Sequence, residues 1–536
     1  MKRPFFLSLA LSSTLLCGGP LFAVTVATDP VGFTNLALPA QSDSHITVPF
    51  TRPAEFVGAI QSASGNQITV AGTPGWGANK FVYAPGSQPN HYYALIGGGG
   101  SSNPKEGHTY LITGSGTNTL TVDTTADNLS GITQNTQVTV IPYWTLATVF
   151  PATDASVSFT PTTSTSSPKT QIIIPNDAAN GINLPPLATY YFSQNADGSS
   201  NNIGWRAFGD NNTDRGDDIL LPDSYFVVRN DNGASGLTLT TLGAVLTKKL
   251  AVPLRTQTGS QQDNPLGIVR PLDVPLSMTG LTPNDGSFLG GASATSDQLL
   301  VFSNAQIGFN KTPIVYYRDP GFNFAWRRAT DTNRIDRGND VIPVGTGFIV
   351  RKAAANPSTT PFWTNAFPVQ ALSAVSRKIH GGTPRDLNLP LTGAAAIEPR
   401  APGSGYEIIV TFPVNVTFNG VGITFGTGSA SVTGSGTNQA TITLTGAASE
   451  QFVTLNLLSV NDGVNTNDVP VTIGLLVGDA NNDGTVNSGD ATFTRTRSGQ
   501  PLDATTFRAD VNVDGAINAG DSTVVRGRSG NTIFRP

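Results

Sequence analysis

Short runs of alternating apolar and polar residues cover most of the chain and constrain its fold more than any other feature. Examples are residues 67–70, 119–123 and 407–412. Alternation at a period of two places the apolar side chains on one face of a strand. Glycine and proline, of which the chain holds 58 and 37, bound these runs together with asparagine and serine. Because such residues suit tight hairpins, the pattern predicts a mainly β protein.

The length of the chain requires several hydrophobic cores. It has 536 residues, whereas single domains usually stop growing at about 250 residues. A stretch rich in threonine, serine and proline at 151–172 marks a seam between units. We expect β-barrel or β-sandwich units followed by a small α-helical module. Their predicted bounds are 24–150 for an all-β unit, 151–395 for a β-rich unit with an internal duplication, 396–477 for a small β-sandwich and 478–530 for the helical module.

The predicted β-rich unit contains a repeated motif. Trp205 is followed by Asp-Arg-Gly at 214–216, and Trp326 is followed by the same three residues at 336–338. The two copies lie about 120 residues apart, which indicates a duplicated β-motif. The Asp-Arg-Gly sequences suit turns with a local ion pair, and the tryptophans suit a hydrophobic core. Exposed tryptophans would instead offer a platform for sugar rings.

The first residues, 1–23, predict a signal peptide. Lys2 and Arg3 precede an apolar run at 5–16, and Gly-Gly-Pro follows before the small residue Ala23. A membrane anchor would need about 20 unbroken apolar residues. The only cysteine, Cys17, lies in this segment, so the mature chain has no thiol for disulfides or thiolate metal sites. We expect a secreted protein, extracellular or at the cell surface, with no transmembrane anchor.

Charge and the spread of reactive side chains argue against several classes of function. The formal net charge is −5, only 12% of residues are charged, and the basic residues are scattered, so a nucleic-acid footprint is missing. The four histidines lie far apart, and none forms a pair with zinc spacing. No Gly-x-Ser-x-Gly elbow leads into a helix. The sequence therefore favours neither a nucleic-acid-binding protein, nor a zinc enzyme, nor a serine hydrolase.

Two segments of twelve residues, 479–490 and 510–521, carry oxygen-bearing side chains at the spacing that calcium requires. Each has Asp, Asn and Asp at positions one, three and five, Gly at six and Asp at twelve. Ca²⁺ binds about six to eight oxygens, so a short loop must turn alternate side chains inward, bend sharply at a glycine and offer the carbonyl of position seven. The predicted ligands are Asp479, Asn481, Asp483, Thr485 and Asp490 in the first loop and Asp510, Asn512, Asp514, Ala516 and Asp521 in the second.

A related segment follows each loop, at 491–499 and 522–530, and each predicts one short helix that ends at glycine. Both loops end in Asp rather than in the bidentate Glu of an ordinary EF-hand, and no helix precedes the first loop. The module has few large apolar residues and no disulfide. Metal binding should therefore supply part of its folding free energy.

On these loops and helices, residues 478–530 resemble the type I dockerin, a duplicated EF-hand-like module. The resemblance implies calcium as cofactor, Ca²⁺-dependent folding, and docking of the exit helices to a cohesin-like protein or a cell-surface scaffold. Near-symmetry would allow either half to face the partner. The loop positions that the resemblance links to recognition, ten and eleven, are Ser-Gly at 488–489 and Ala-Gly at 519–520. Four arginines make the helices basic: Arg495, Arg497, Arg526 and Arg528.

The body of the chain, from Thr-Asp-Pro-Val-Gly-Phe at 28–33 through residue 355, resembles an uncharacterised family of secreted β-rich bacterial proteins. That family implies no activity. The sequence therefore favours a non-catalytic protein that binds calcium and docks through its C-terminal module. The alternative is a polysaccharide-degrading enzyme or a carbohydrate-binding accessory subunit, with a polysaccharide as a further partner. A glycosidase needs two carboxylates, but the chain has only five glutamates, none in a recognisable strand-end motif.

Overall fold

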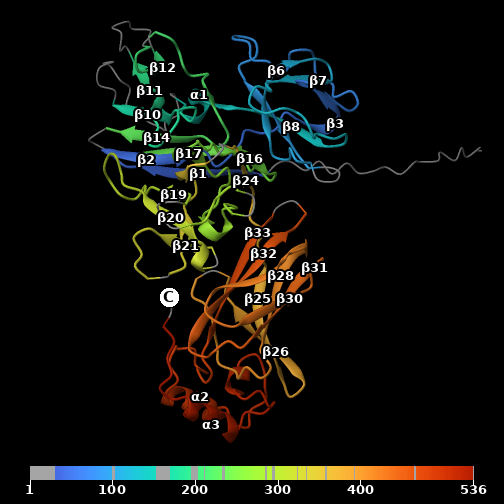
Figure 1. Ribbon diagram of the computed structural model, residues 1–536, viewed down its shortest axis with the longest axis vertical. Coiled ribbons are helices and arrows are strands. Elements are labelled where there is room, and N and C mark those ends of the chain that lie inside the picture. Colours follow the sequence, from blue (N-terminus) through green and yellow to red (C-terminus); the bar gives the residue numbers. More distant parts are fainter. Residues whose placement is uncertain are drawn as a thin grey trace, which may run out of the picture.

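The computed structural model describes most of the chain, and the predicted signal peptide and Cys17 lie outside the described residues. These are 30–98, 103–151, 169–194, 203–210, 212–231, 236–283, 286–291, 296–322, 324–333, 335–355, 359–391, 393–463 and 466–534. Strands predominate and helices are confined to short segments, which confirms the predicted mainly β fold with barrel and sandwich units. The β units fill most of Figure 1, and a small helical module lies at the end farthest from the barrel. No helix within the described residues has the length and apolar character needed to cross a membrane.

Six strands close into a small barrel in the order β3-β4-β7-β6-β5-β8. They are β3 (Phe56–Ser64), β4 (Gln67–Val70), β5 (Tyr92–Ile96), β6 (Thr109–Ser115), β7 (Thr119–Val122) and β8 (Gln137–Pro142). Their inward positions alternate along each strand and form one core that includes Ile60, Ile68, Leu120 and Val140. The period-two pattern of the sequence thus produces a filled barrel.

Two five-stranded antiparallel sheets share one strand order. The first runs β12-β11-β10-β14-β2 and the second β21-β20-β19-β23-β17. The strands of the first are β2 (Ser42–Thr47), β10 (Thr170–Pro175), β11 (Pro186–Gln194), β12 (Ile203–Ala207) and β14 (Tyr225–Asn230). Those of the second are β17 (Gln262–Gly267), β19 (Gln298–Val301), β20 (Ile314–Asp319), β21 (Ala325–Arg328) and β23 (Gly347–Lys352). An arginine–aspartate pair recurs at the same place, Arg229–Asp43 at 2.8 Å and Arg351–Asp263 at 2.7 Å.

Four two-stranded ribbons and short helical turns complete these two copies. The ribbons pair β1 (Val31–Leu38) with β15 (Leu237–Ala244), β9 (Trp144–Thr145) with β13 (Ile219–Leu220), β16 (Leu250–Pro253) with β24 (Phe362–Asn365), and β18 (Val274–Pro275) with β22 (Val341–Ile342). The helical turns are α1 (Leu146–Val149), η1 (Leu276–Met278) and η2 (Pro320–Phe322).

The Asp-Arg-Gly sequences of the repeat form the same turn in both copies. Asp214 Oδ1 accepts the Gly216 N–H at 3.0 Å, and Asp336 Oδ1 accepts the Gly338 N–H at 2.8 Å. The arginines form local ion pairs, Arg215 with Asp210 at 2.7 Å and Arg337 with Asp331 at 2.9 Å. The tryptophans belong to the cores of the two copies, and Trp205 and Trp326 each expose only 2% of their surface. These tryptophans therefore offer no exposed platform for sugar rings.

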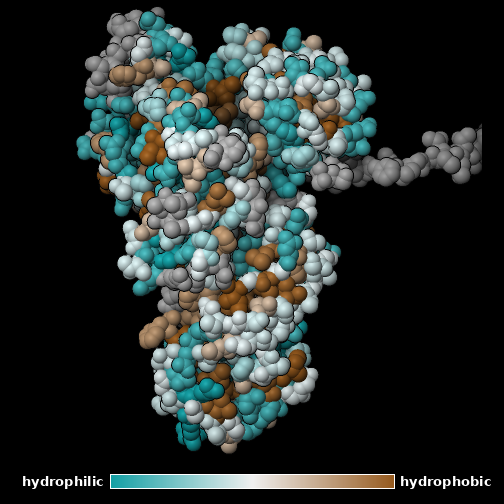
Figure 2. All heavy atoms as spheres, in the orientation of Figure 1, coloured by the Kyte–Doolittle hydropathy of each residue, from teal (hydrophilic) through white to brown (hydrophobic). Residues whose placement is uncertain are grey.

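A sandwich of two sheets follows the second copy. One sheet has the order β26-β25-β28-β31-β30 and the other β27-β33-β32-β29. The strands are β25 (Ser373–His380), β26 (Thr383–Leu389), β27 (Ile397–Glu398), β28 (Tyr406–Val416), β29 (Gly420–Phe425), β30 (Ser429–Thr433), β31 (Thr437–Thr445), β32 (Gln451–Asn461) and β33 (Thr466–Leu475). Alternate residues of both sheets face one hydrophobic core. Apolar side chains also gather on the surface at mid-height of the face shown in Figure 2.

Strand pairing crosses two of the predicted unit boundaries. β1 and β2 precede the barrel but pair with β15 and β14 of the first copy, so the barrel is an insertion between β2 and β9. β25 and β26 precede residue 396, yet they form part of the sandwich. Local patterns cannot show such long-range pairing. We therefore infer a division into the barrel, two repeated sheets, a sandwich from β25 to β33, and the C-terminal module.

The C-terminal module contains two helices, α2 (Ser488–Thr496) and α3 (Ala519–Gly527), with the short turn η3 (Phe507–Ala509) between them. Its apolar side chains are not a core of their own. They pack with the end of the sandwich in one cluster formed by Ile397, Phe452, Leu476, Val477, Val486, Val511, Val525 and Ile533. Sandwich and module therefore share a hydrophobic core.

Candidate calcium loops of the C-terminal module

The first loop folds its acidic side chains inward. Asp479 is fully buried, and its Oδ1 and Oδ2 accept the backbone N–H groups of Asp483 and Gly484, both at 3.0 Å. Gly484 has a φ of +87°, which a residue without Cβ adopts at little cost. The carboxylates of Asp479, Asp483 and Asp490 each place an oxygen within 4.8 Å of the others. This group could hold a cation.

The last acidic residue of the first loop also begins helix α2. Asn487 is the N-cap, and its Oδ1 accepts the Gly489 N–H at 2.6 Å. In return, Asp490 Oδ2 accepts the Asn487 N–H at 2.9 Å, while its Oδ1 accepts the Asn481 N–H at 3.1 Å. A reciprocal cap of this kind satisfies backbone donors that would otherwise lack a partner. The Asp490 carboxylate therefore caps the helix and also accepts a hydrogen bond from the loop backbone.

The second loop repeats this arrangement. Asp510 is fully buried and accepts the N–H groups of Asp514 and Gly515 at 3.2 and 2.9 Å. Asn518 caps α3, and Asp521 Oδ2 accepts its N–H at 2.9 Å. The two predicted exit helices are thus present and begin alike. Within the described residues, however, only the first loop brings three carboxylates within 4.8 Å of one another.

The other predicted ligands lie in the loops and bond to their neighbours. At position three, the Asn481 side chain donates to Asp483 Oδ2 at 2.8 Å. At position seven, the Thr485 carbonyl accepts from the Asn487 side chain at 3.4 Å. The second-loop equivalents are Asn512 to Asp514 at 2.8 Å and Asn518 to the Ala516 carbonyl at 3.3 Å. The five predicted positions of each loop are therefore linked to one another by hydrogen bonds within that loop.

Burial perturbs one acid in each loop. Burial raises the pKa of Asp479, and the charge of Asp490 adds to this effect. Burial also raises the pKa of Asp521. Among the described residues no lysine or arginine pairs with an acid of the first loop. Oxygen donors alone, with the buried Asp479 and Asp490 of the first loop in no ion pair among the described residues, fit a hard cation such as Ca²⁺.

The comparison with known families agrees with this geometry. Residues 477–528 match the model of the dockerin type I domain. The C-terminal module is a dockerin type I domain. A dockerin implies docking to a cohesin partner, dockerins typically bind calcium, and proteins that carry them are generally extracellular. The prediction of the dockerin is thereby confirmed.

The remaining comparisons add little. No curated protein matches the chain. Two solved structures align with it at 14% identity, a crystal structure of the S-layer protein rSbsC(31-844) and a structure of domains 1-6 of the surface layer protein SbsC. They cover 79% and 81% of this chain, at TM-scores of 0.10 and 0.11. The chain spans 54% and 55% of their lengths. Likeness at this level carries no argument about the fold.

The dockerin helices present a basic groove. Helices α2 and α3 pack against each other, and the groove is lined by Asn487, Ser488, Ala491, Thr492, Arg495, Arg526 and Ser529. Arg495 and Arg526 are exposed, and neither forms an ion pair with another described residue. The groove therefore offers two free guanidinium groups.

Sequence reasoning missed the residues through which the sandwich holds the dockerin. His380 at the end of β25 contacts Asp510, and the Ala401 N–H donates to the Val511 carbonyl at 2.8 Å. Within the dockerin itself, Arg508 donates to the backbone carbonyls of Asp479 and Ala480, both at 3.1 Å. The sequence places His380 far from the loops, and its isolation suggested no metal role. No local pattern could have paired residues so distant in the chain.

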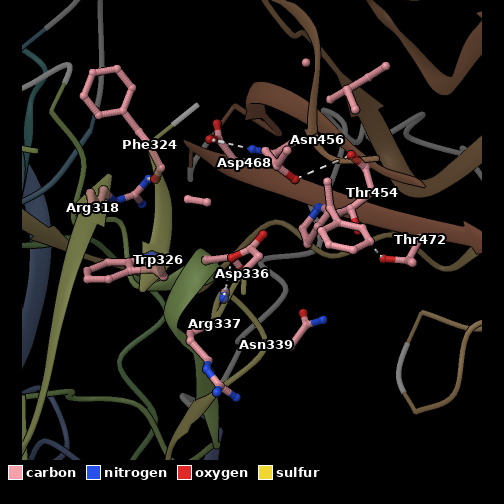
Figure 3. Close-up of a pocket in the computed structure, with 18 of the residues that line it drawn as sticks. Arg318, Phe324, Trp326, Asp336, Arg337, Asn339, Thr454, Asn456, Asp468 and Thr472 are labelled. Carbon is pink, nitrogen blue, oxygen red and sulfur yellow. Dashed lines mark hydrogen bonds between the residues drawn. The ribbon is translucent and has the colours of Figure 1, made fainter. Parts of the chain in front are cut away.

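A separate cavity of about 640 Å³ lies between the second copy and the sandwich. Figure 3 shows Arg318, Phe324 and Trp326 on one side and Asn456 and Asp468 on the other. The guanidinium of Arg318 lies 4.7 Å above the Trp326 ring. Asp340, a carboxylate near Trp326 in sequence, accepts from Tyr316 at 2.9 Å and pairs with Arg328 at 2.6 Å. The Asp340 carboxylate is therefore already bonded to two neighbouring side chains.

Proposed function

We propose that this chain is an extracellular, non-catalytic protein whose dockerin binds calcium and attaches the β-rich body to a cohesin-like protein or cell-surface scaffold. The observation that carries the proposal is the duplicated loop, in which each buried first aspartate and each capping twelfth aspartate recur with the same backbone bonds. The proposed ligands are the ten loop positions predicted from the sequence. The dockerin family match supports the same role.

Calcium would act in this proposal mainly as a folding cofactor. Each loop buries the carboxylates of its first and twelfth positions, which repel one another when both are ionised. A divalent cation offsets that repulsion and replaces the water that burial removes. Loop, cap and helix share the twelfth carboxylate, so ordering the loop also orders the helix. We therefore expect helix content and calcium binding to rise together.

The partner should carry an acidic surface. The groove between α2 and α3 exposes Arg495 and Arg526, and Arg528 is exposed nearby. Complementary charge steers association and selects partners more than it adds affinity. A cohesin-like domain with aspartate or glutamate opposite this groove fits best. Replacing Arg495 and Arg526 by glutamate should slow association and weaken its dependence on salt.

The test is calorimetric titration of the full chain with calcium, followed by circular dichroism. Wild type should bind about two ions, one per loop, and gain helix. The double variant Asp479→Ala with Asp510→Ala should lose both effects. Asp177→Ala with Asp231→Ala, which removes the same charge from exposed positions of the body, is the matched control. Wild type that binds no calcium would end the proposal.

A carbohydrate role for the body is the weaker alternative, because the repeat tryptophans are buried and Asp340 is engaged by Tyr316 and Arg328. A screen of the full chain against soluble and insoluble glycans tests it. Hydrolysis, or retention on a glycan column, would revive the alternative.

A further inference from the structure

The second calcium loop touches the sandwich through a buried histidine. His380 ends strand β25, and its Nδ1 lies 2.8 Å from Asp510 Oδ2. Both side chains are fully buried. The two residues are 130 positions apart in the chain. Asp510 is the first acidic position of the second loop, so the sandwich reaches a proposed calcium ligand directly.

The neighbours of His380 determine which ring nitrogen carries the hydrogen. Arg400 Nη1 lies 3.2 Å from His380 Nε2. A guanidinium can only donate, so Nε2 must accept and the hydrogen must be on Nδ1. Glu398 holds Arg400 in place through a fully buried ion pair of 2.6 Å. His380 is therefore a fixed donor aimed at Asp510.

Because of the bond from His380, the two carboxylate oxygens of Asp510 have different hydrogen-bond partners. Oδ2 accepts from His380 and from the Gly515 N–H, whereas Oδ1, among the described residues, accepts only the Asp514 N–H at 3.2 Å. Oδ1 thus keeps more of its lone-pair capacity for a cation. In the first loop Asp479 accepts backbone N–H groups alone among the described residues. His380 has no counterpart there.

The turn that carries His380 is pressed against the second loop. A Cβ on Gly515 would lie 2.6 Å from the Cα of Gly381, so the two backbones are in contact. Beyond them, the Ala401 N–H donates to the Val511 carbonyl at 2.8 Å. The contact is therefore an extended seam between sandwich and loop, and His380 lies at its centre.

We propose that the second calcium site is composite: the dockerin supplies its ligands, and the sandwich supplies His380 as a positioning residue that fixes Asp510. At the first site, no sandwich side chain among the described residues hydrogen-bonds a proposed ligand. The inference rests on the proposed calcium function. Residues that orient a metal ligand typically change metal affinity by about 10- to 100-fold when they are removed, so the two loops should respond differently to changes at His380.

The test measures calcium affinity of each loop separately in the full chain, with calcium alone as the probe. Asp483→Ala silences the first loop and Asp514→Ala silences the second; both replace an exposed acid at position five. His380→Leu and His380→Asn are then made in each background. The asparagine amide can still donate, whereas leucine cannot. Hydrogen exchange of the sandwich at saturating calcium reports whether each variant folds.

With the first loop silenced, His380→Leu should weaken calcium binding by about tenfold or more, and His380→Asn should recover part of the loss. With the second loop silenced, both variants should bind as their parent does. The inference would be overturned if His380→Leu lost calcium affinity equally in both backgrounds. It would also be overturned if His380→Leu lost no affinity at the second loop, or bound calcium more tightly there. If His380→Leu does not fold, a partial loss by His380→Asn at the second loop alone supports the inference, and either no loss there or a loss equal at both loops refutes it. Failure of both parent backgrounds to bind calcium would instead refute the proposed function.

Discussion

The two loops of the dockerin have similar sequences and the same internal bonds, yet their contacts with the rest of the molecule differ. The first loop packs against the C-terminal segment, where the Ile533 N–H donates to the Gly484 carbonyl at 3.0 Å, and among the described residues its side chains meet the sandwich only through Asn482, which is not a proposed ligand, and apolar contacts. The second loop packs against the sandwich through His380 and Gly381. Local sequence therefore determines the shape of a loop, and its surroundings determine how firmly it is held.

We expect the largest difference in stability between the two loops when a buried charge beside the second loop is removed. Arg400→Met leaves Glu398 and His380 Nε2 without their partner in a fully buried site. Breaking a buried ion pair by removing one member costs about 3–5 kcal/mol. The control is Arg508→Met beside the first loop, which breaks no ion pair but removes hydrogen bonds to two neutral carbonyls and a longer-range attraction to nearby carboxylates, at about 1–3 kcal/mol.

Hydrogen exchange over residues 373–534 can measure both variants, since exchange of buried amides reports local unfolding free energy. Tryptophan fluorescence would not serve, because the five tryptophans all precede residue 364. A larger loss for Arg508→Met than for Arg400→Met would mean that the first loop, and not the second, depends more on its surroundings.

The cost of replacing the glycine at position six should also differ between the two loops, by a smaller amount. Gly515 has a φ of +96° and Gly484 a φ of +87°, so alanine is strained at both, by about 1–2 kcal/mol. At 515 the new Cβ would also clash with the Gly381 backbone at 2.6 Å, whereas at 484 the nearest atom, the Ile533 carbonyl oxygen, is 3.4 Å away. We expect Gly515→Ala to cost about 2–4 kcal/mol in total.

The free energy of local unfolding of each loop, measured by hydrogen exchange with and without calcium, checks this prediction. Gly484→Ala is the matched control. Equal costs at the two positions would show that the turn at Gly381 can move aside, and the seam between sandwich and dockerin would then be loose.

Sequence reasoning succeeded where structure is local and failed where it depends on distant pairing. The oxygen spacing of 479–490 and 510–521 and the helices that follow are encoded within a few residues, and the dockerin was predicted from them. The pairing of β2 with β14 joins segments separated by the whole barrel. The contact of His380 with Asp510 likewise bridges 130 positions. Neither leaves a periodic signal in the sequence.

We expect the smallest difference in stability from position four of the loops. The first loop has Asn482 there, and the second has Val513. Both adopt the left-handed region, with φ of 67° and 66°. Asparagine tolerates this conformation, whereas a β-branched side chain is strained in it. Val513→Asn should therefore stabilise the second loop by about 1 kcal/mol.

Hydrogen exchange of residues 510–521 measures the gain from Val513→Asn, and the reciprocal change Asn482→Val is the control. That change should cost more than the first gains, because Asn482 Oδ1 also accepts the Ile397 N–H at 3.3 Å. A strained valine persists only where its surroundings impose the backbone, and the seam around His380 and Gly381 is the part of the molecule that can do so. If Val513→Asn gives no gain, the second loop is relaxed, and the sandwich does not hold it in a conformation that its own sequence disfavours.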